Sequence, residues 1–375
     1  MKGGHKIAID VRSLMEGRHS GVEEYTSQII RAMLEVPGDN KYEVFYNAWS
    51  PVELPYLGED IERAVFKYPN KLFNASQYVL NWPRWDGLIT ADCFFVPNAR
   101  PLPVSARTPY VVTVHDLSFE RFPEFYSRQR RLWHRYVQPR KLLRNADHII
   151  AVSAAAARDV TDIYGLDAAK VTVIHSGTPD WKEPPSREEI DRVREKYGLP
   201  RRYVLFLGTF EPRKNIIGVV RSYTAIADSV EQDLVIAGSR GWLMGPIQAA
   251  VRQSSARARI KVMGFVEEED KQCLYAGADL FVYPSFYEGF GFPPLEALLA
   301  GTPVVTSFNS SLPEVVGDWA TLVDPANAAE IAVVLRELLN DLPEVTSQQR
   351  EEIRNRYSWG NAARETIEVM ESVLE

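Results

Sequence analysis

Short apolar runs rich in β-branched and aromatic residues alternate along the chain with longer segments whose apolar residues recur every three or four positions. The short runs predict buried strands, and the longer segments predict helices that cover a sheet. The strands predicted in the first half are Lys6–Val11, Tyr42–Asn47, Cys93–Val96, Tyr110–Val114, His148–Val152 and Val171–Ile174. Those predicted in the second half are Tyr203–Leu207, Leu234–Ala237, Ile260–Met263, Leu280–Tyr283, Pro303–Thr306 and Thr321–Val323. Strands and helices that alternate in this way predict an α/β fold with parallel sheets.

A stretch rich in Pro and Gly, Gly177–Ser186, separates the two sets of strands and is typical of a linker. The 375 residues also exceed the length at which a single hydrophobic core keeps growing. We therefore predict two Rossmann-like, doubly wound domains, residues 1–180 and 181–346, that face each other across a cleft. Residues 347–375 have apolar positions at helical spacing and predict a C-terminal helix.

The composition matches that of soluble globular proteins, with 45% hydrophobic and 25% charged residues. No window approaches the roughly 18 consecutive apolar residues of a membrane span. Asp10 and Arg12 interrupt the apolar run near the N-terminus, so it does not resemble a secretory signal and we expect a cytoplasmic protein. Cys93 and Cys273 lie in apolar surroundings and are predicted to be buried free thiols. A net charge of −7 gives no general attraction to nucleic acid.

The first motif with chemical meaning is Glu288–Glu296, which follows a predicted strand. Its two glycines free the backbone, and Pro293 and Pro294 fit the first turn of a helix. A loop at a helix N-terminus offers N–H groups to phosphates or sugar hydroxyls. Carboxylates accept hydrogen bonds in pairs, which suits the vicinal hydroxyls of a sugar and of a ribose. A surface turn with solvated acids is the alternative.

The second motif is Gly208–Asn215, which joins a predicted strand to a helix that should begin near Ile216. Arg213 and Lys214 arrive at the helix N-terminus, where two cations and the helix dipole favour a bound diphosphate. A solvated basic turn is the alternative interpretation.

The third motif is Ser20–Tyr25, after the first strand of the chain. The apolar face that follows it predicts a helix starting at Gly21, a residue without a side chain that can approach a phosphate closely. An ordinary flexible turn between strand and helix would look the same.

The fourth motif is His115–Asp116, directly after the predicted strand Tyr110–Val114. A histidine at the carboxyl end of a central strand can contact a sugar or take part in proton transfer. A structural histidine with a satisfied hydrogen bond is the alternative.

A basic segment, Ser127–Arg144, interleaves seven Arg and Lys residues with apolar and aromatic ones. Basic amphipathic helices bind acidic surfaces, so this segment could meet anionic lipid at the inner membrane surface or a lipid-diphosphate acceptor. A plain solvated helix is the other interpretation that we retain.

Taken together, the four motifs in this order on two α/β domains resemble the retaining glycosyltransferases of family four, which have the GT-B fold. The resemblance covers nearly the whole chain. Its most specific parts are Glu288-x7-Glu296 with the following Ala297–Val305, and Glu211-Pro-Arg-Lys-Asn215. The second of these is similar to the branch that contains mannosyl- and rhamnosyltransferases of bacterial surface polysaccharide assembly. This similarity implies mannose as the favoured sugar, and a GDP-sugar rather than a UDP-sugar as the favoured donor.

The resemblance implies roles for single residues. The four it implies to be catalytic are His115 near the transferred sugar, Arg213 and Lys214 on the donor diphosphate, and Glu288 on the sugar hydroxyls. The donor-binding set it implies is Gly21, Thr209, Val266, Gly289, Phe290, Gly291, Phe292 and Glu296. Many relatives carry a basic residue at the place of Thr209, and we expect Arg213 to take over its role. The final helix is implied to cross back onto the first domain.

The implied reaction is transfer of a hexose with retention of configuration, without a metal or another cofactor, from a nucleotide sugar to a glycan or a lipid-linked saccharide. The chain has no Asp-x-Asp pair of the kind that binds Mg²⁺ with a nucleotide sugar. The segments Leu72–Trp85 and Asn98–Pro103 are expected on the acceptor side. A nicotinamide-dependent dehydrogenase is disfavoured because Pro293-Pro294 stands where a third glycine is needed. A metal hydrolase is disfavoured because the six histidines form no ligand-spaced cluster. A non-catalytic nucleotide-sugar-binding protein remains the alternative.

Overall fold

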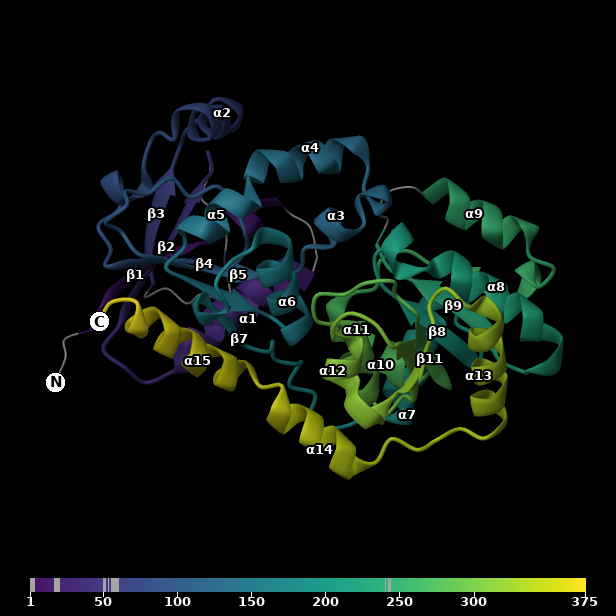
Figure 1. Cartoon of the computed structure of the whole chain (residues 1–375). Helices are drawn as coiled ribbons and strands as arrows, with labels where there is room; N and C mark the ends of the chain where they lie inside the picture. The colour runs from purple at the N-terminus through teal and green to yellow at the C-terminus, as the bar shows by residue number, and fades with distance from the viewer. Residues whose placement is uncertain are drawn as a thin grey trace. The chain divides into compact units, whose positions relative to one another are not determined.

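The chain forms two compact units, each built on its own parallel sheet (Figure 1). In the computed structural model the first unit comprises Met1–Gly177 with Tyr357–Glu375, and the second comprises Thr178–Arg356. The structure describes residues 4–16, 21–49, 52, 54, 61–239, 241 and 244–375. The predicted α/β class with two Rossmann-like, doubly wound domains is confirmed.

The first unit contains a seven-stranded parallel sheet in the order β3-β2-β1-β4-β5-β6-β7. Its strands are β1 (Lys6–Asp10), β2 (Lys41–Asn47), β3 (Glu62–Phe66), β4 (Cys93–Val96), β5 (Tyr110–Val114), β6 (His148–Ala151) and β7 (Val171–Val173). Six of them match the predicted strands to within one residue at either end. The edge strand β3 was missed, because its first two residues are charged and exposed.

The helices of the first unit cover this sheet. They are α1 (Gly21–Glu35), α2 (Asn70–Leu80), α3 (Ser118–Arg121), α4 (Arg128–Val137), α5 (Pro139–Asn145), α6 (Ala154–Tyr164) and α15 (Trp359–Ser372), with short 3-10 turns η1 (Arg12–Glu16), η3 (Trp85–Gly87), η4 (Pro123–Phe125) and η5 (Ala168–Lys170). The last helix, α15, packs against α1. Asn40 Nδ2 also donates a hydrogen bond of 2.8 Å to Glu371 on that helix.

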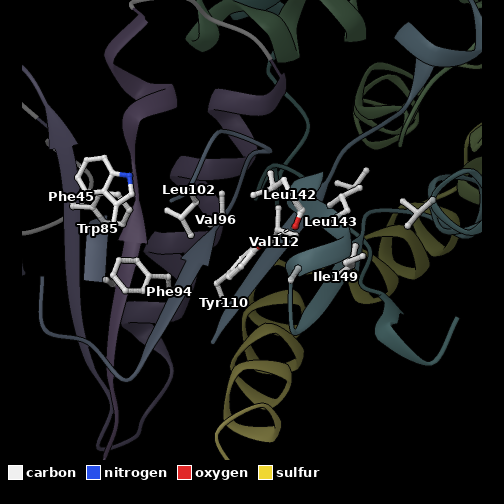
Figure 2. Close-up of a cluster of buried hydrophobic side chains, with 14 of the residues drawn as sticks. Phe45, Trp85, Phe94, Val96, Leu102, Tyr110, Val112, Leu142, Leu143 and Ile149 are labelled. Atoms are coloured by element: carbon white, nitrogen blue, oxygen red, sulfur yellow. Dashed lines mark hydrogen bonds between the residues drawn. The ribbon is translucent and has the colours of Figure 1, made fainter. Parts of the chain in front are cut away.

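The core of the first unit is built from the apolar faces of strands and helices, as Figure 2 shows. The Trp85 ring is fully buried, with its centroid 4.6 Å from that of Phe45. Burying an aromatic or large aliphatic side chain stabilises a fold by about 1.5–3 kcal/mol. On the other side of the cluster, the Tyr110 hydroxyl donates a 2.6 Å hydrogen bond to the carbonyl of Leu142. This contact fixes α5 against β5.

The second unit contains a six-stranded parallel sheet in the order β10-β9-β8-β11-β12-β13. Its strands are β8 (Tyr203–Leu207), β9 (Asp233–Ala237), β10 (Ile260–Val262), β11 (Leu280–Tyr283), β12 (Val304–Ser307) and β13 (Thr321–Val323). All six were predicted, with ends that differ by at most one residue. The strands β8 and β11 at the centre are buried throughout, as expected for a sheet covered on both faces.

The helices of the second unit are α7 (Arg187–Tyr197), α8 (Ile216–Ile226), α9 (Met244–Gln253), α10 (Glu268–Ala276), α11 (Phe292–Leu299), α12 (Leu312–Val316), α13 (Ala328–Asn340) and α14 (Ser347–Arg356), with 3-10 turns η6 (Pro212–Lys214), η7 (Ala227–Ser229), η8 (Arg257–Arg259) and η9 (Gly317–Trp319). After the linker, α7 begins with a reciprocal capping box between Ser186 and Glu189. No helix in the described part of the chain is both long and apolar enough to cross a membrane.

Each sheet has one point at which the direction of strand addition reverses. In the first unit this point lies between β1 and β4, and in the second it lies between β8 and β11. In open parallel sheets, ligands bind beyond the carboxyl ends of the strands at such a switch point, where the loops diverge to either side. The loops after β1, β4, β8 and β11 are therefore the places where chemistry is expected.

Both cysteines are free and buried, as predicted. Burial raises the pKa of the Cys93 thiol to about 12. Burial also raises the pKa of the Cys273 thiol. Because the thiolate is the reactive form, neither residue is suited to nucleophilic chemistry.

Candidate functional site

The loops after β8 and β11 meet in a buried cluster of charged side chains at the switch point of the second sheet. Lys214 Nζ donates to Glu288 Oε1 at 2.6 Å and to the Tyr283 hydroxyl at 2.5 Å. Arg213 Nη1 donates to Glu288 Oε2 at 3.0 Å and to the carbonyl of Tyr287 at 2.7 Å. Each oxygen of the Glu288 carboxylate therefore has its own cationic partner.

A second carboxylate, Glu211, completes this cluster. Arg213 donates to Glu211 Oε1 from Nη2 at 2.7 Å and from Nε at 3.1 Å. Glu211 is only 4% exposed. Two carboxylates and two cations give a cluster without net charge, which lowers the free energy of burying all four groups. Glu211 was quoted in the sequence motif but given no role, although an acid two residues before Arg213 was the available signal.

The cluster holds Glu288 ionised. Burial would raise the pKa of Glu288, but the adjacent Arg213 and Lys214 outweigh it and lower this pKa to about 2. Burial and the neighbouring Arg213 guanidinium lower the pKa of Lys214, against the opposing effect of Glu288 and Glu211. The charge on the lysine thus depends on the carboxylates beside it.

The segment that carries the two cations is fixed by its own turn chemistry. Pro212 opens η6, where its missing N–H costs nothing. Asn215 has a left-handed backbone, and its side-chain oxygen accepts from Gly218 N at 3.2 Å, which caps α8. Its amide nitrogen donates to the carbonyl of Pro325 at 2.7 Å. The predicted helix start near Ile216 is confirmed, with both cations directly before it.

The loop Glu288–Gly291 is held by the segment that follows the neighbouring strand β12. Glu288 N donates to Ser310 Oγ at 3.0 Å. Ser311 Oγ lies 3.0 Å from the carbonyl of Glu288 and 2.7 Å from that of Phe290, to which it donates. Gly291 has φ +114°, a conformation that L side chains rarely adopt, and it directly precedes α11. The predicted helix that begins with the proline pair is confirmed as α11.

Glu296 lies in the second turn of α11 and is buried at 9% exposure. Its Oε2 accepts a 2.8 Å hydrogen bond from the Tyr275 hydroxyl of α10. Burial, together with the adjacent Glu296 carboxylate, raises the pKa of Tyr275 well above its usual range. Tyr275 therefore keeps its proton and orients the carboxylate.

The remaining residues predicted to bind the donor in the second unit lie at the same carboxyl edge of the sheet. Thr209 follows β8, and its hydroxyl is 3.3 Å from that of Ser239, which follows β9. Val266 follows β10 and is buried. Gly289, Phe290 and Phe292 belong to the loop and first turn described above, and the rings of the two phenylalanines lie 5.1 Å apart.

His115 and Gly21 belong to the first unit. His115 follows β5, and its Nε2 lies 2.8 Å from the carbonyl of Pro97, which follows β4. A carbonyl can only accept, so Nε2 carries the proton and Nδ1 is the acceptor of the neutral ring. Burial lowers the pKa of His115. The His115 ring also contacts Tyr25 edge to face at 4.7 Å, on the helix α1 that begins at Gly21.

The structure thus brings Arg213, Lys214 and Glu288 into direct contact and places the other second-unit residues at the same sheet edge. His115 and Gly21 occupy the corresponding edge of the first unit. Their participation in one site with the donor residues stays a prediction. Ser20, the first residue of the third motif, lies outside the described residues.

The sequence analysis assigned no role in this site to five residues that contact its predicted members. They are Glu211, Tyr275, Tyr283, Ser310 and Ser311. The two serines follow β12, so their position at a strand end was the available signal. The tyrosines lie on a helix and a strand and give no signal in the sequence.

On the predicted acceptor side, the segments Leu72–Trp85 and Asn98–Pro103 both contribute to one cavity of about 330 Å³ in the first unit. Tyr78 and Tyr136 line it, with ring centroids 5.1 Å apart. Aromatic and polar side chains line this cavity, and its part on the acceptor side stays a prediction. Across the described ranges, no group of three or more His, Cys, Asp or Glu residues is placed to hold a metal ion.

Two protein-family models match the chain. The model described as Glycosyltransferase Family 4 matches residues 19–182, and the model described as Glycosyl transferases group 1 matches residues 187–357. The two matches fall within the first and second units respectively, apart from a few residues at their ends.

Similar curated proteins include two from Escherichia coli. The chain is 34% identical to O-antigen chain mannosyltransferase B over 68% of either chain. It is 25% identical to the serotype-specific mannosyltransferase WbdA. That match covers 98% of this chain but only 48% of WbdA.

Solved structures are also similar. Anabaena HepE, determined with UDP and glucose, has a TM-score of 0.75 at 19% identity. The match covers 98% of this chain and 100% of the HepE chain. Sucrose-phosphate synthase from Thermosynechococcus elongatus has a TM-score of 0.76 at 18% identity and covers 98% of this chain and 99% of its own. At this identity the likeness shows the fold, which is GT-B as expected.

Proposed function

Because the chain belongs to glycosyltransferase family 4, we propose that it transfers a hexose, with mannose favoured, from a nucleoside-diphosphate sugar to a glycan or lipid-linked saccharide. The proposal includes retention of the anomeric configuration and preference for a GDP-sugar over a UDP-sugar. The mannosyltransferase relatives support the choice of sugar.

The observation that carries the proposal is the Glu288 carboxylate with one cation on each oxygen. Its low pKa keeps it charged at neutral pH, and an ionised carboxylate can accept about four hydrogen bonds in all, two on each oxygen. A carboxylate fixed in this way can accept from two vicinal sugar hydroxyls. Arg213 and Lys214 bring positive charge to the same place, where an anionic diphosphate would lie beside the sugar.

Charge develops on the nucleoside diphosphate as its bond to the sugar breaks. Cations and helix N-termini that are fixed before the reaction stabilise such charge without reorganisation, and one fixed donor is worth roughly 3–4 kcal/mol of barrier. Arg213 and Lys214 are held by Glu288, Tyr283 and Glu211 in the way this mechanism requires. We assign leaving-group stabilisation to them, with the departing phosphate taking the proton of the acceptor hydroxyl on the same face.

The other assignments follow the sheet edge. Glu296 would bind the ribose hydroxyls, since Tyr275 orients its carboxylate. Val266 would contact the base, and Thr209 would contact the phosphates together with the backbone of Gly21. The main chain of Gly289–Phe292 would lie along the donor.

His115 would act from the first unit. Its protonated Nε2 is bound to a backbone carbonyl, and the lowered pKa keeps the ring neutral at pH 7. Nδ1 is then a hydrogen-bond acceptor for a hydroxyl of the transferred sugar. Arg213 and Lys214, beside the proposed diphosphate position, would supply the positive charge that a metal ion supplies in other enzymes. We therefore expect transfer without added metal.

The test begins with the donor. A thermal-shift panel of GDP- and UDP-sugars should show stabilisation by GDP-mannose, because a ligand at 100 times its Kd adds about 2.7 kcal/mol. A larger shift with UDP-sugars would contradict the donor assignment. NMR of the anomeric proton in the product should then show the configuration of the donor, and the rate should survive EDTA.

The roles of the cluster are tested by Lys214→Met and Glu288→Gln. Turnover should fall about 10²–10³-fold in each, as for loss of one preorganised charge contact. The matched control is Lys196→Met, which removes a lysine that pairs with Asp270 elsewhere in the same unit and should leave turnover unchanged. Binding of nucleotide sugars without transfer or hydrolysis by the unaltered protein would identify a non-catalytic binding protein instead.

A further inference from the structure

The first unit contains a second cavity, of about 720 Å³, lined by residues of α3, α4 and α5; Figure 1 labels these three helices. Ligand pockets in proteins have volumes of about 300–1,000 Å³. Five cationic side chains line this cavity: Arg131, Arg135, Arg140, Lys141 and Arg144. None of them belongs to the nucleotide-sugar site proposed above.

The local sequence explains why so many cations gather there. Arg131 and Arg135 are four residues apart and lie on one face of α4. Gln138 has φ +50°, which ends α4, and Pro139 starts α5 directly afterwards. The break turns α5 so that Arg140 and Arg144, also four residues apart, line the same cavity.

The cavity has a large excess of positive charge. Its one acidic lining residue is Glu120, whose carboxylate accepts a 3.0 Å hydrogen bond from the Tyr164 hydroxyl. Among the described residues, none of the five cations has a carboxylate within ion-pair distance. Burial lowers the pKa of His134 to about 4, so this ring adds no charge at pH 7 and stacks on Phe119 as an apolar wall. Unpaired cations that line one cavity attract an anion.

Exposed apolar side chains lie on α4, which lines the cavity, and on α2, which contacts α4. Leu132 on α4 is 67% exposed and is adjacent to Arg131 and one turn from Arg135. The helix α2 contacts α4: the Tyr136 hydroxyl donates to the carbonyl of Asn74 at 2.7 Å, and the Tyr78 and Tyr136 ring centroids lie 5.1 Å apart. Several large apolar side chains of α2 and the residues after it are exposed: Leu72, Val79, Leu80 and Trp82. A cationic cavity beside an apolar surface matches an amphiphile with an anionic head.

We propose that this cavity binds the phosphate or diphosphate of a lipid-linked saccharide acceptor, and that Leu132 and α2 contact its apolar chain. The inference rests on the proposed function and names the acceptor class. Gln138 and Lys141 line both this cavity and the 330 Å³ cavity with Tyr78 and Tyr136. The two cavities are therefore adjacent, as the phosphate and the sugar of one acceptor require.

The kinetic test compares two acceptors with the same saccharide, one a dodecyl diphosphate and one a dodecyl glycoside without phosphate. The double variant Arg131→Gln/Arg144→Gln should raise KM for the diphosphate acceptor about tenfold or more, as loss of charge-assisted hydrogen bonds does. The value of kcat, KM for the donor and KM for the dodecyl glycoside should stay unchanged. Equal losses with both acceptors would contradict the inference.

The matched control is Arg128→Gln/Arg158→Gln, which removes the same charge from exposed positions of α4 and α6 outside the cavity lining. It should leave KM for the diphosphate acceptor unchanged, and a similar rise in both double variants would show general charge attraction instead. Sedimentation with phosphatidylglycerol vesicles and no acceptor separates the two sources of phosphate. Both double variants should lose vesicle binding equally, whereas a selective loss in the cavity variant would assign the cavity to membrane headgroups.

Titration with dodecyl phosphate separates the two proposals. The unaltered protein should bind it, and the cavity variant should bind it at least about tenfold more weakly while melting at the same temperature. Such binding without sugar transfer by the unaltered protein would contradict the proposed function and, with it, the assignment of the ligand as an acceptor. Transfer to the diphosphate acceptor without a difference between variants would contradict the cavity alone.

Discussion

Replacing Glu288 by Gln should destabilise the second unit more than replacing Lys214 by Met. The first change leaves the buried Lys214 and the largely buried Arg213 with only Glu211 to compensate them. The second leaves Glu288 with its 3.0 Å contact to Arg213. The two changes remove the same ion pair, and the difference comes from the group that each leaves behind.

The contacts set the magnitudes. Removal of one partner from a buried ion pair costs about 3–5 kcal/mol, because the other charge stays buried without compensation. We expect about 4 kcal/mol for Glu288→Gln and about 2 kcal/mol for Lys214→Met, where Arg213 still satisfies the carboxylate. The double variant has neither charge and should cost about 3 kcal/mol, well below the sum.

The pH dependence has a definite sign. Burial already lowers the pKa of Lys214, and Glu288 opposes that shift, so its removal lowers the pKa further. At a pH between this lowered folded pKa and the unfolded pKa of 10.5, Lys214 carries a proton in the unfolded chain but not in the folded variant. The free energy of unfolding of the variant therefore rises with pH in this range. The deficit of Glu288→Gln should therefore shrink as the pH is raised from 7 toward 10.

Urea unfolding at pH 7 and 9, followed by circular dichroism, measures these costs. Lys196→Met serves as control, since Lys196 is exposed and its solvent-screened pair with Asp270 should contribute little to stability. Costs of the two single changes that add to within about 0.5 kcal/mol in the double variant would refute the coupling. A larger cost for Lys214→Met than for Glu288→Gln would refute the reasoning about the remaining charge.

Three further predictions follow from single contacts. In the unaltered protein, the stability that Glu288 contributes is complete above pH 4.5 and lost as the pH falls toward its folded pKa of about 2, so Glu288→Gln should have a flatter acid limb in thermal melts. A Cβ on Gly177 would lie 2.4 Å from the backbone nitrogen of Trp359, so Gly177→Ala should cost about 1–3 kcal/mol; Gly87→Ala, with open space around it, is the control, and equal melting temperatures would contradict the clash. Cys93 should react with a thiol reagent at pH 8 only after unfolding, and fast labelling of the native protein would contradict its burial.

The sequence allowed the strands to be predicted well because most of them are buried on both faces. Such strands appear as uninterrupted apolar runs, and β8 and β11 are examples. The edge strand β3 pairs with β2 alone, and its first two residues are charged and exposed. It therefore lacks the uninterrupted apolar run by which the other strands were recognised. The periodicity of 347–375 likewise predicted one helix, whereas the structure has α14 and α15 with a break at Tyr357-Ser358. The pattern continues across the break because Tyr357 is itself buried.

The candidate site divides in a similar way. Arg213, Lys214 and Glu288 could be found because their loops follow predicted strands, and parallel strands bring their carboxyl ends to one edge. Their pairing could not be found, since nothing in the sequence says which strand neighbours β8. The strand order β9-β8-β11 supplies that fact. The same order places β12 beside β11, so that Ser310 and Ser311 reach the backbone of the Glu288 loop.

The pairing also explains how one cluster can serve two kinds of group. A carboxylate without partners in this position would take up a proton, because burial raises its pKa, and a lysine without partners would lose one. The cations lower the pKa of Glu288 to about 2 and so keep it charged, and the Glu288 carboxylate in turn opposes the lowering of the Lys214 pKa by burial. A ligand that carries hydroxyls next to a diphosphate can meet the carboxylate and the cations separately. Under the proposed function, an intact nucleotide sugar would contact both kinds of group, whereas a free sugar or a free nucleotide would contact only one, so we expect the intact nucleotide sugar to bind more tightly.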